Sequence, residues 1–134
     1  VCSSDLTGLA CWLLGLRTPE QVRRDPLWGA LFENFVVSEA LKDRFNQAEN
    51  SQLYFYRDAD GNEVDLLIPV GRKLHGIEVK AGATVHNEYF KGLHRFDAHH
   101  PDLLTSACVI FGGEVAQMRT PWPALPWLNL MVRP

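Results

Sequence analysis

Apolar residues recur with a helical period in the first third of the chain. Residues 7–16 are almost continuously apolar and predict a short helix, and Pro19 suits the first turn of a helix within the polar stretch 17–25. Between residues 26 and 45 the apolar positions return every three or four residues, which predicts the longest helix of the chain. We therefore expect the chain to begin with helices.

From residue 51 the pattern becomes typical of strands. Residues 52–57 are rich in aromatic side chains, Asp60-Gly61 is a favoured hairpin turn, and residues 63–70 and 74–80 contain further strand-like runs. These segments predict a hairpin followed by a third strand.

Alternation along these strands predicts which side chains share a face of the sheet. In the second strand, Val64 and Leu66 should lie on one face and Asp65 on the other. In the third strand, Glu78 and Lys80 should lie on one face, opposite the apolar residues between and before them. The charged pair is thus expected side by side on one surface.

The rest of the chain predicts one more helix and one or two strands. Residues 84–98 have a helical apolar side, 106–111 form a buried type of strand, and 114–118 can pair back as a short strand. The prolines of the tail, at positions 121, 123 and 126, argue against a further strand there. The expected fold class is α/β, with a small mixed sheet flanked by helices.

Composition narrows the class of protein without identifying its chemistry. The chain has 134 residues and a net charge of -3, so it lacks the overall positive field of proteins that bind nucleic acid non-specifically. Its three cysteines have neither zinc-finger nor disulfide-framework spacing, which favours a reducing, cytoplasmic location. No apolar run approaches the length of a membrane span, so no membrane association is expected.

Four residues form a candidate catalytic set. Hydrolysis of a phosphodiester needs a hard divalent cation, and Mg²⁺ is commonly bound by one or two carboxylates, which Asp65 and Glu78 can supply. Lys80 can hold the attacking water or offset negative charge in the transition state. Glu33, from the long helix, can orient a metal-bound water or complete the coordination.

The same residues carry a resemblance to a known superfamily. Glu33 in a leading helix, Asp65 in EVDLLI and Glu78-Val79-Lys80 in GIEVKAG resemble the PD-(D/E)xK nucleases. More closely, the ordered blocks TGLACWLLG, LWGALFENFVVSEALK, YFYRDADGNEVDLLI, LHGIEVKAGATV and LHRFDAHHPDL resemble the uncharacterised C-terminal domain (domain of unknown function 4143) of prokaryotic AAA-type ATPases. The resemblance implies a restriction-endonuclease-like PD-(D/E)xK core and a partner ATPase domain, N-terminal to this segment, that binds ATP.

This resemblance also predicts a domain organisation. Residues 1–6 (VCSSDL) resemble the translation of a sequencing-adaptor tail, and we expect the protein itself to begin at Thr7. Residues 7–25 are then a helical lead-in, and residues 26–134 a single nuclease-like domain within a longer ATPase.

Two functions remain open at this level. The first is a Mg²⁺-dependent DNA endonuclease, in which Arg57, Lys91 and Arg95 line a path for phosphates. The second is an inactive module of the same fold that regulates the ATPase or binds a partner or DNA, and the acidic net charge favours it. In the simplest structural reading, Asp65 is a solvated strand residue, and Glu78 and Lys80 form a surface ion pair worth under ~1 kcal/mol.

Overall fold

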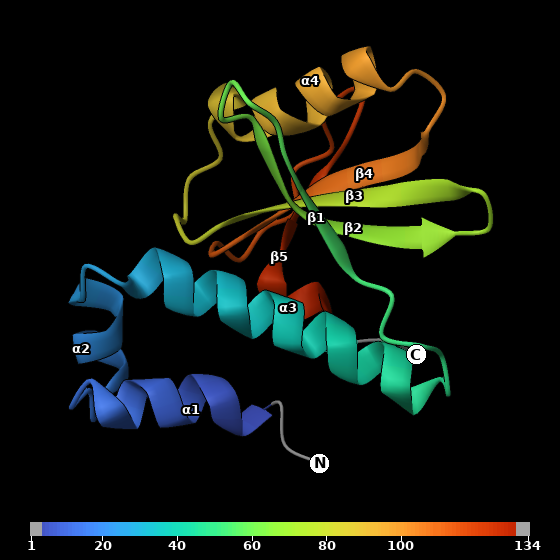
Figure 1. Cartoon of the computed structure of the whole chain (residues 1–134). Coiled ribbons are helices and arrows are strands. Elements are labelled where there is room, and N and C mark those ends of the chain that lie inside the picture. The colour runs from blue at the N-terminus through green and yellow to red at the C-terminus, as the bar shows by residue number, and fades with distance from the viewer. Residues whose placement is uncertain (1–3, 131–134) are drawn as a thin grey trace. The chain divides into compact units, whose positions relative to one another are not determined.

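Three helices precede five strands in the computed structural model, which describes residues 4–130 (Figure 1). The chain divides into two units, a helical unit that ends at Ser51 and a sheet unit that begins at Gln52. The α/β class, the mixed sheet and the flanking helices agree with the sequence prediction. The predicted domain limits at residues 7, 26 and 134 stay predictions.

The helical unit consists of α1 (Ser4–Leu13), α2 (Pro19–Arg24) and α3 (Trp28–Asn46). A capping box begins α2, because the Thr18 hydroxyl accepts the backbone N–H of Gln21 and the Gln21 side chain accepts that of Thr18. The amide of Asn34 donates to the Thr7 hydroxyl at 3.1 Å and so joins α3 to α1. Within residues 4–130, no helix has both the length and the apolar character that crossing a membrane requires.

Five strands form the mixed sheet in the order β1-β2-β3-β4-β5. Their bounds are β1 (Tyr54–Arg57), β2 (Glu63–Val70), β3 (Lys73–Lys80), β4 (Leu104–Phe111) and β5 (Ala124–Pro126). Pairing is antiparallel from β1 to β3 and parallel from β3 to β5. The hairpins turn at Gly61 and Gly71, whose positive φ values of 78° and 63° favour glycine.

A helical crossover joins the parallel strands β3 and β4 and covers one face of the sheet (Figure 1). It consists of η1 (Asn87–Phe90) and α4 (Lys91–His99), where a single helix over 84–98 was predicted. A Cβ on Gly76 of β3 would lie 2.9 Å from Leu93 Cδ2, so α4 packs closely on this face. The core between them contains Val64, Leu67, Val85, Phe90, Leu93, Phe96, Ala107, Val109, Phe111 and Ala124.

The C-terminal tail corrects one prediction from sequence. Residues 124–126 form β5, which pairs in parallel with β4 although Pro126 ends it, and η2 (Trp127–Leu130) follows. Proline is tolerated because β5 is the edge of the sheet, where one row of N–H groups has no strand to bond. The strand expected over 114–118 is absent, and only Gln117 pairs with Ala124 as an isolated bridge.

Candidate functional site

A β-bulge in β2 contains Asp65. Tyr54 of β1 lies opposite Leu67 and Tyr56 opposite Val64, so three steps along β2 match two along β1. Val64 and Leu67 therefore both join the core beneath α4, although strict alternation would place them on opposite faces of the sheet. Bulges re-aim side chains locally, and Asp65 lies within this one.

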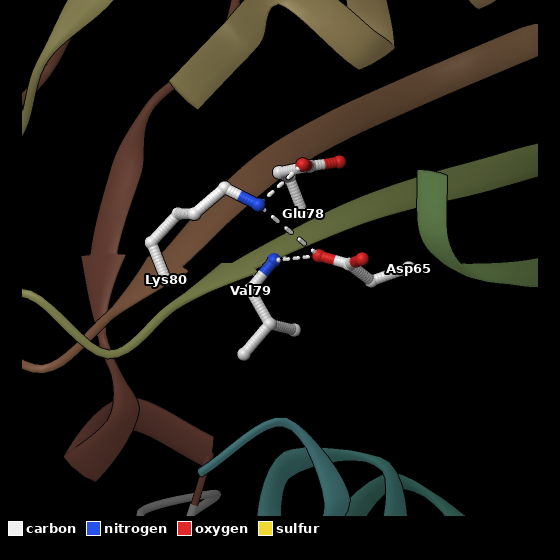
Figure 2. Close-up of polar contacts among 4 residues, drawn as sticks. All are labelled: Asp65, Glu78, Val79 and Lys80. Atoms are coloured by element: carbon white, nitrogen blue, oxygen red, sulfur yellow. Dashed lines mark hydrogen bonds and ion pairs between the residues drawn. The ribbon is translucent and has the colours of Figure 1, made fainter. Parts of the chain in front are cut away.

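The Asp65 side chain takes the place of a main-chain acceptor between β2 and β3. The pairing of these strands runs as far as Leu66 and Ile77. Beyond this point the Asp65 carboxylate accepts the backbone N–H of Val79 through Oδ2 at 2.6 Å (Figure 2). A charge-assisted bond of this kind fixes the carboxylate against the backbone of β3.

Lys80 joins Asp65 to Glu78. Figure 2 shows its ammonium between the two carboxylates, with Nζ 2.6 Å from Glu78 Oε1 and 3.6 Å from Asp65 Oδ2. Both acidic side chains are nearly buried, with 9% of Glu78 and 10% of Asp65 exposed, whereas 32% of the Lys80 side chain is exposed. We call these three residues the acid–lysine cluster.

Helix α4 begins directly over the cluster. A Cβ on Gly92 would overlap the carbonyl oxygen of Glu63 and would lie 3.2 Å from Glu78 Oε2. Only glycine therefore allows the first turn of α4 to approach the start of β2 and the Glu78 carboxylate this closely. Sequence reasoning missed Gly92, because nothing in the local pattern around it indicates a close contact with another strand.

The cluster keeps Lys80 in its charged form. Burial lowers the pKa of Lys80, but the hydrogen bond and charge of Glu78, together with the charge of Asp65, outweigh it, and the pKa is raised overall. The side chain is therefore an ammonium at neutral pH. It can donate hydrogen bonds and offset negative charge, but it cannot act there as a general base.

The donor set of the cluster fits Mg²⁺. Asp65 and Glu78 present two carboxylates to one point from adjacent strands, and Mg²⁺ typically takes one or two carboxylates and completes its shell with waters and phosphate oxygens. Among residues 4–130, no group of three or more His, Cys, Asp or Glu side chains is arranged to hold a metal.

The three predicted phosphate contacts lie near the start of β2 and of α4. Arg57 pairs with Glu63, at 3.0 Å between Nε and Oε1, and Arg95 donates to the side-chain oxygen of Asn62. Lys91 is exposed and directly precedes Gly92. Two of these three cations are thus already bonded within the chain.

Glu33 lies on α3, in the helical unit. It is exposed, whereas Phe32 and Val36 of the same helix are buried. Its membership of the site stays a prediction. The sheet unit brings together Asp65, Glu78 and Lys80 of the predicted catalytic set.

A second polar cluster, which the sequence did not reveal, lies on the opposite face of β3 and β4. His75 Nδ1 is 2.7 Å from Ser106 Oγ, and His75 Nε2 is 3.8 Å from Cys108 Sγ. Burial lowers the pKa of His75 and raises that of the Cys108 thiol to about 12, so both groups are neutral at pH 7. We call these residues the histidine cluster; finding it required the β3–β4 register, which pairs His75 with Ser106.

Comparison with known proteins identifies the family. A family model described as "Domain of unknown function (DUF4143)" matches residues 28–130, and the chain belongs to that family. The matched range begins at α3, ends at η2 and includes the whole acid–lysine cluster. No curated protein and no solved structure was found to match the chain.

Proposed function

We propose that the sheet unit of this family member is a PD-(D/E)xK nuclease-type domain that hydrolyses phosphodiester bonds in DNA with Mg²⁺. One observation carries the proposal: a single lysine ammonium contacts two nearly buried carboxylates from adjacent strands. Charges in such a position are costly and are typically retained for a site. We further propose that the parent protein has an N-terminal AAA-type P-loop ATPase domain that binds ATP, as the sequence resemblance implies.

In this proposal Asp65 and Glu78 hold the Mg²⁺, which would neutralise the developing charge of the phosphoryl group. The bond from the Val79 N–H fixes one oxygen of Asp65, and the packing of α4 at Gly92 limits the movement of Glu78. Lys80, as an ammonium, donates hydrogen bonds to a phosphate oxygen or to the attacking water and offsets negative charge in the transition state. Its raised pKa favours this electrostatic role over proton abstraction.

The remaining predicted residues have supporting roles in this proposal. Lys91 is exposed at the start of α4 and can contact a phosphate directly. Arg57 and Arg95 would exchange their bonds to Glu63 and Asn62 for phosphate oxygens when DNA binds. Glu33, from α3, would act as the fourth member of the catalytic set.

Two observations favour a second candidate, an inactive module that regulates the ATPase or binds a partner. Arg57 and Arg95 are already bonded within the chain, and the net charge of the chain is -3. Neither feature attracts a polyanion. In this alternative the acid–lysine cluster stabilises the sheet beneath α4 and no reaction occurs there.

A cleavage assay separates the two candidates. The chain is incubated with plasmid, single-stranded and branched DNA in Mg²⁺ or Mn²⁺, beside the Glu78→Gln and Lys80→Met variants. The wild type should cleave at least one substrate, and each variant should cleave it at least ~100-fold more slowly, because removing one electrostatic contact to the transition state typically costs this much.

Matched controls are available in exposed positions of the same unit. Glu114→Gln in the loop after β4 and Lys73→Met at the start of β3 repeat the two chemical changes in exposed residues outside the cluster. Both should cleave at the wild-type rate, and circular dichroism checks that every variant is folded. Absence of metal-dependent cleavage by the wild type, or equal rates in all variants, would rule out the nuclease function.

A further inference from the structure

We infer that Lys80 is the built-in counter-ion of the Asp65–Glu78 pair, and that a divalent cation binds only by displacing its ammonium. The inference rests on the proposed nuclease function and concerns how that same site is loaded. It is drawn from the distances and burial within the acid–lysine cluster.

The ammonium lies where a shared cation would have to bind. Lys80 Nζ is within 3.6 Å of one oxygen from each carboxylate, Asp65 Oδ2 and Glu78 Oε1. Mg²⁺ approaches its oxygen ligands to about 2.0–2.1 Å. Two cations that share the same oxygens at these distances repel each other strongly in a partly buried site, so both cannot remain.

Lys80 is the member of the cluster that can move. Asp65 is held by its bond to the Val79 N–H, and the first turn of α4 packs against Glu78. The lysine has a flexible four-carbon stem and is the most exposed of the three side chains. Metal entry should therefore turn the ammonium outward and leave the two carboxylates in place.

This movement would couple metal binding to substrate binding. A displaced ammonium loses two anionic partners, and a phosphate of the bound DNA is the natural replacement. Before the metal arrives, the lysine also prevents repulsion between the two neighbouring carboxylates. Lys80 would thus neutralise the two carboxylates while no metal is bound and, once displaced, would bind a phosphate of the substrate.

If Lys80 is the counter-ion, removing it should raise the affinity for a divalent cation but lower the rate of DNA cleavage. Lys80→Met should bind a divalent cation more tightly than the wild type, because no internal cation competes for the oxygens, while its cleavage is lost. If Lys80 instead helped to assemble the metal site, its removal would weaken metal binding. Activity alone cannot separate these cases, so affinity has to be measured.

Isothermal titration calorimetry with Mn²⁺ alone, without DNA, provides this measurement on the full chain. Lys80→Met should bind Mn²⁺ at least roughly tenfold more tightly than the wild type, equivalent to about 1.4 kcal/mol. Lys73→Met, an exposed lysine on the same strand, should match the wild type within about twofold. Lys80→Gln, which is neutral and polar, repeats the test should the Met variant fail to fold.

A structural readout on the wild type is independent of any variant. The NMR signal of the Lys80 ammonium should shift when Mg²⁺ saturates the protein, because its two anionic partners are lost, and the Lys73 signal should not. An unshifted Lys80 signal at saturating Mg²⁺ overturns the inference.

The outcomes distinguish this inference from the function on which it rests. A wild type that binds Mn²⁺ and cleaves DNA, beside a Lys80→Met variant that binds Mn²⁺ equally or more weakly, overturns the counter-ion role and leaves the nuclease function standing. Absence of Mn²⁺ binding by the wild type and by both Lys80 variants contradicts the proposed function together with the inference.

Discussion

The two faces of β3 carry polar clusters of opposite electrostatic character, one shared with β2 and the other with β4. On the face beneath α4, Lys80 is kept as an ammonium between two carboxylates. On the other face, His75 lies between a hydroxyl and a thiol, and burial keeps both the imidazole and the thiol neutral. The same strand, β3, therefore supports charge on one side and neutral groups on the other.

This difference indicates where chemistry can occur. The histidine cluster is built of neutral groups that satisfy one another, and the raised pKa of Cys108 removes the thiolate that a nucleophile needs. The acid–lysine cluster brings three charged side chains together, and one of them, Lys80, is partly exposed to solvent. Charge kept near the edge of a core can bind a cation or a phosphate, whereas a neutral hydrogen-bonded chain mainly holds strands in register.

The largest expected effect comes from disturbing the packing above the acid–lysine cluster. Gly92→Ala places a Cβ against the carbonyl oxygen of Glu63, so α4 must shift from β2. Overpacking of this kind typically costs about 1–3 kcal/mol, and we expect about 2–3 kcal/mol because the obstacle is backbone. Urea denaturation followed by circular dichroism measures the loss.

The matched control is Gly29→Ala in α3. No atom would lie within 4 Å of a Cβ there, and alanine favours the helix, so the stability should stay the same or rise by up to about 1 kcal/mol. Equal effects of the two substitutions would show that α4 does not pack tightly over the cluster.

Part of this architecture could be predicted because it depends on neighbouring residues alone. The two-residue spacing of Glu78 and Lys80 puts them on one strand face whatever the fold, and the structure confirms that they meet. The periodicity of residues 26–45 predicted α3, which begins two residues later at Trp28. There the Asp25 carboxylate accepts the backbone N–H of Leu27 and holds the preceding turn.

The features that were missed all depend on distant pairing. The bulge at Asp65 arises from the register between β1 and β2, and the histidine cluster arises from the parallel register of β3 and β4. Strand β5 forms despite Pro126 because it lies at the edge of the sheet. Hydrophobic periodicity describes one segment at a time and contains no information about such registers.

A smaller effect is expected from the ion pair inside the acid–lysine cluster. In a double-mutant cycle of Glu78→Gln and Lys80→Met, the coupling free energy should be about 1–2 kcal/mol. Burial of Glu78 strengthens the interaction, while the exposed third of Lys80 limits it through solvent screening. Urea denaturation of the four proteins measures the coupling.

Arg57 and Glu63 provide the matched pair for this cycle. Their 3.0 Å contact has a similar geometry, but 66% of Arg57 and 48% of Glu63 are exposed, so their coupling should stay below about 0.5 kcal/mol. Similar coupling energies in the two pairs would contradict the special electrostatic character of the acid–lysine cluster.

The smallest effect concerns the histidine cluster and depends on pH. Burial lowers the pKa of His75 in the folded state, so the unfolded chain binds a proton there more readily. The contribution of His75 to stability is therefore fully present above its ordinary pKa of 6.5 and is lost as pH falls below it, by at most about 1.4 kcal/mol per pH unit.

Urea denaturation at pH 7.5 and 5.5, applied to the wild type and to His75→Gln, isolates this contribution because all other groups titrate in both proteins. The stability advantage of the wild type should shrink at the lower pH, since protonation must then occur between Ser106 and Cys108 or break their contacts. If the stability of the wild type and of His75→Gln changed equally between the two pH values, His75 would be protonated as easily in the folded protein as in water. The electrostatic contrast between the two faces of the sheet would then be wrong.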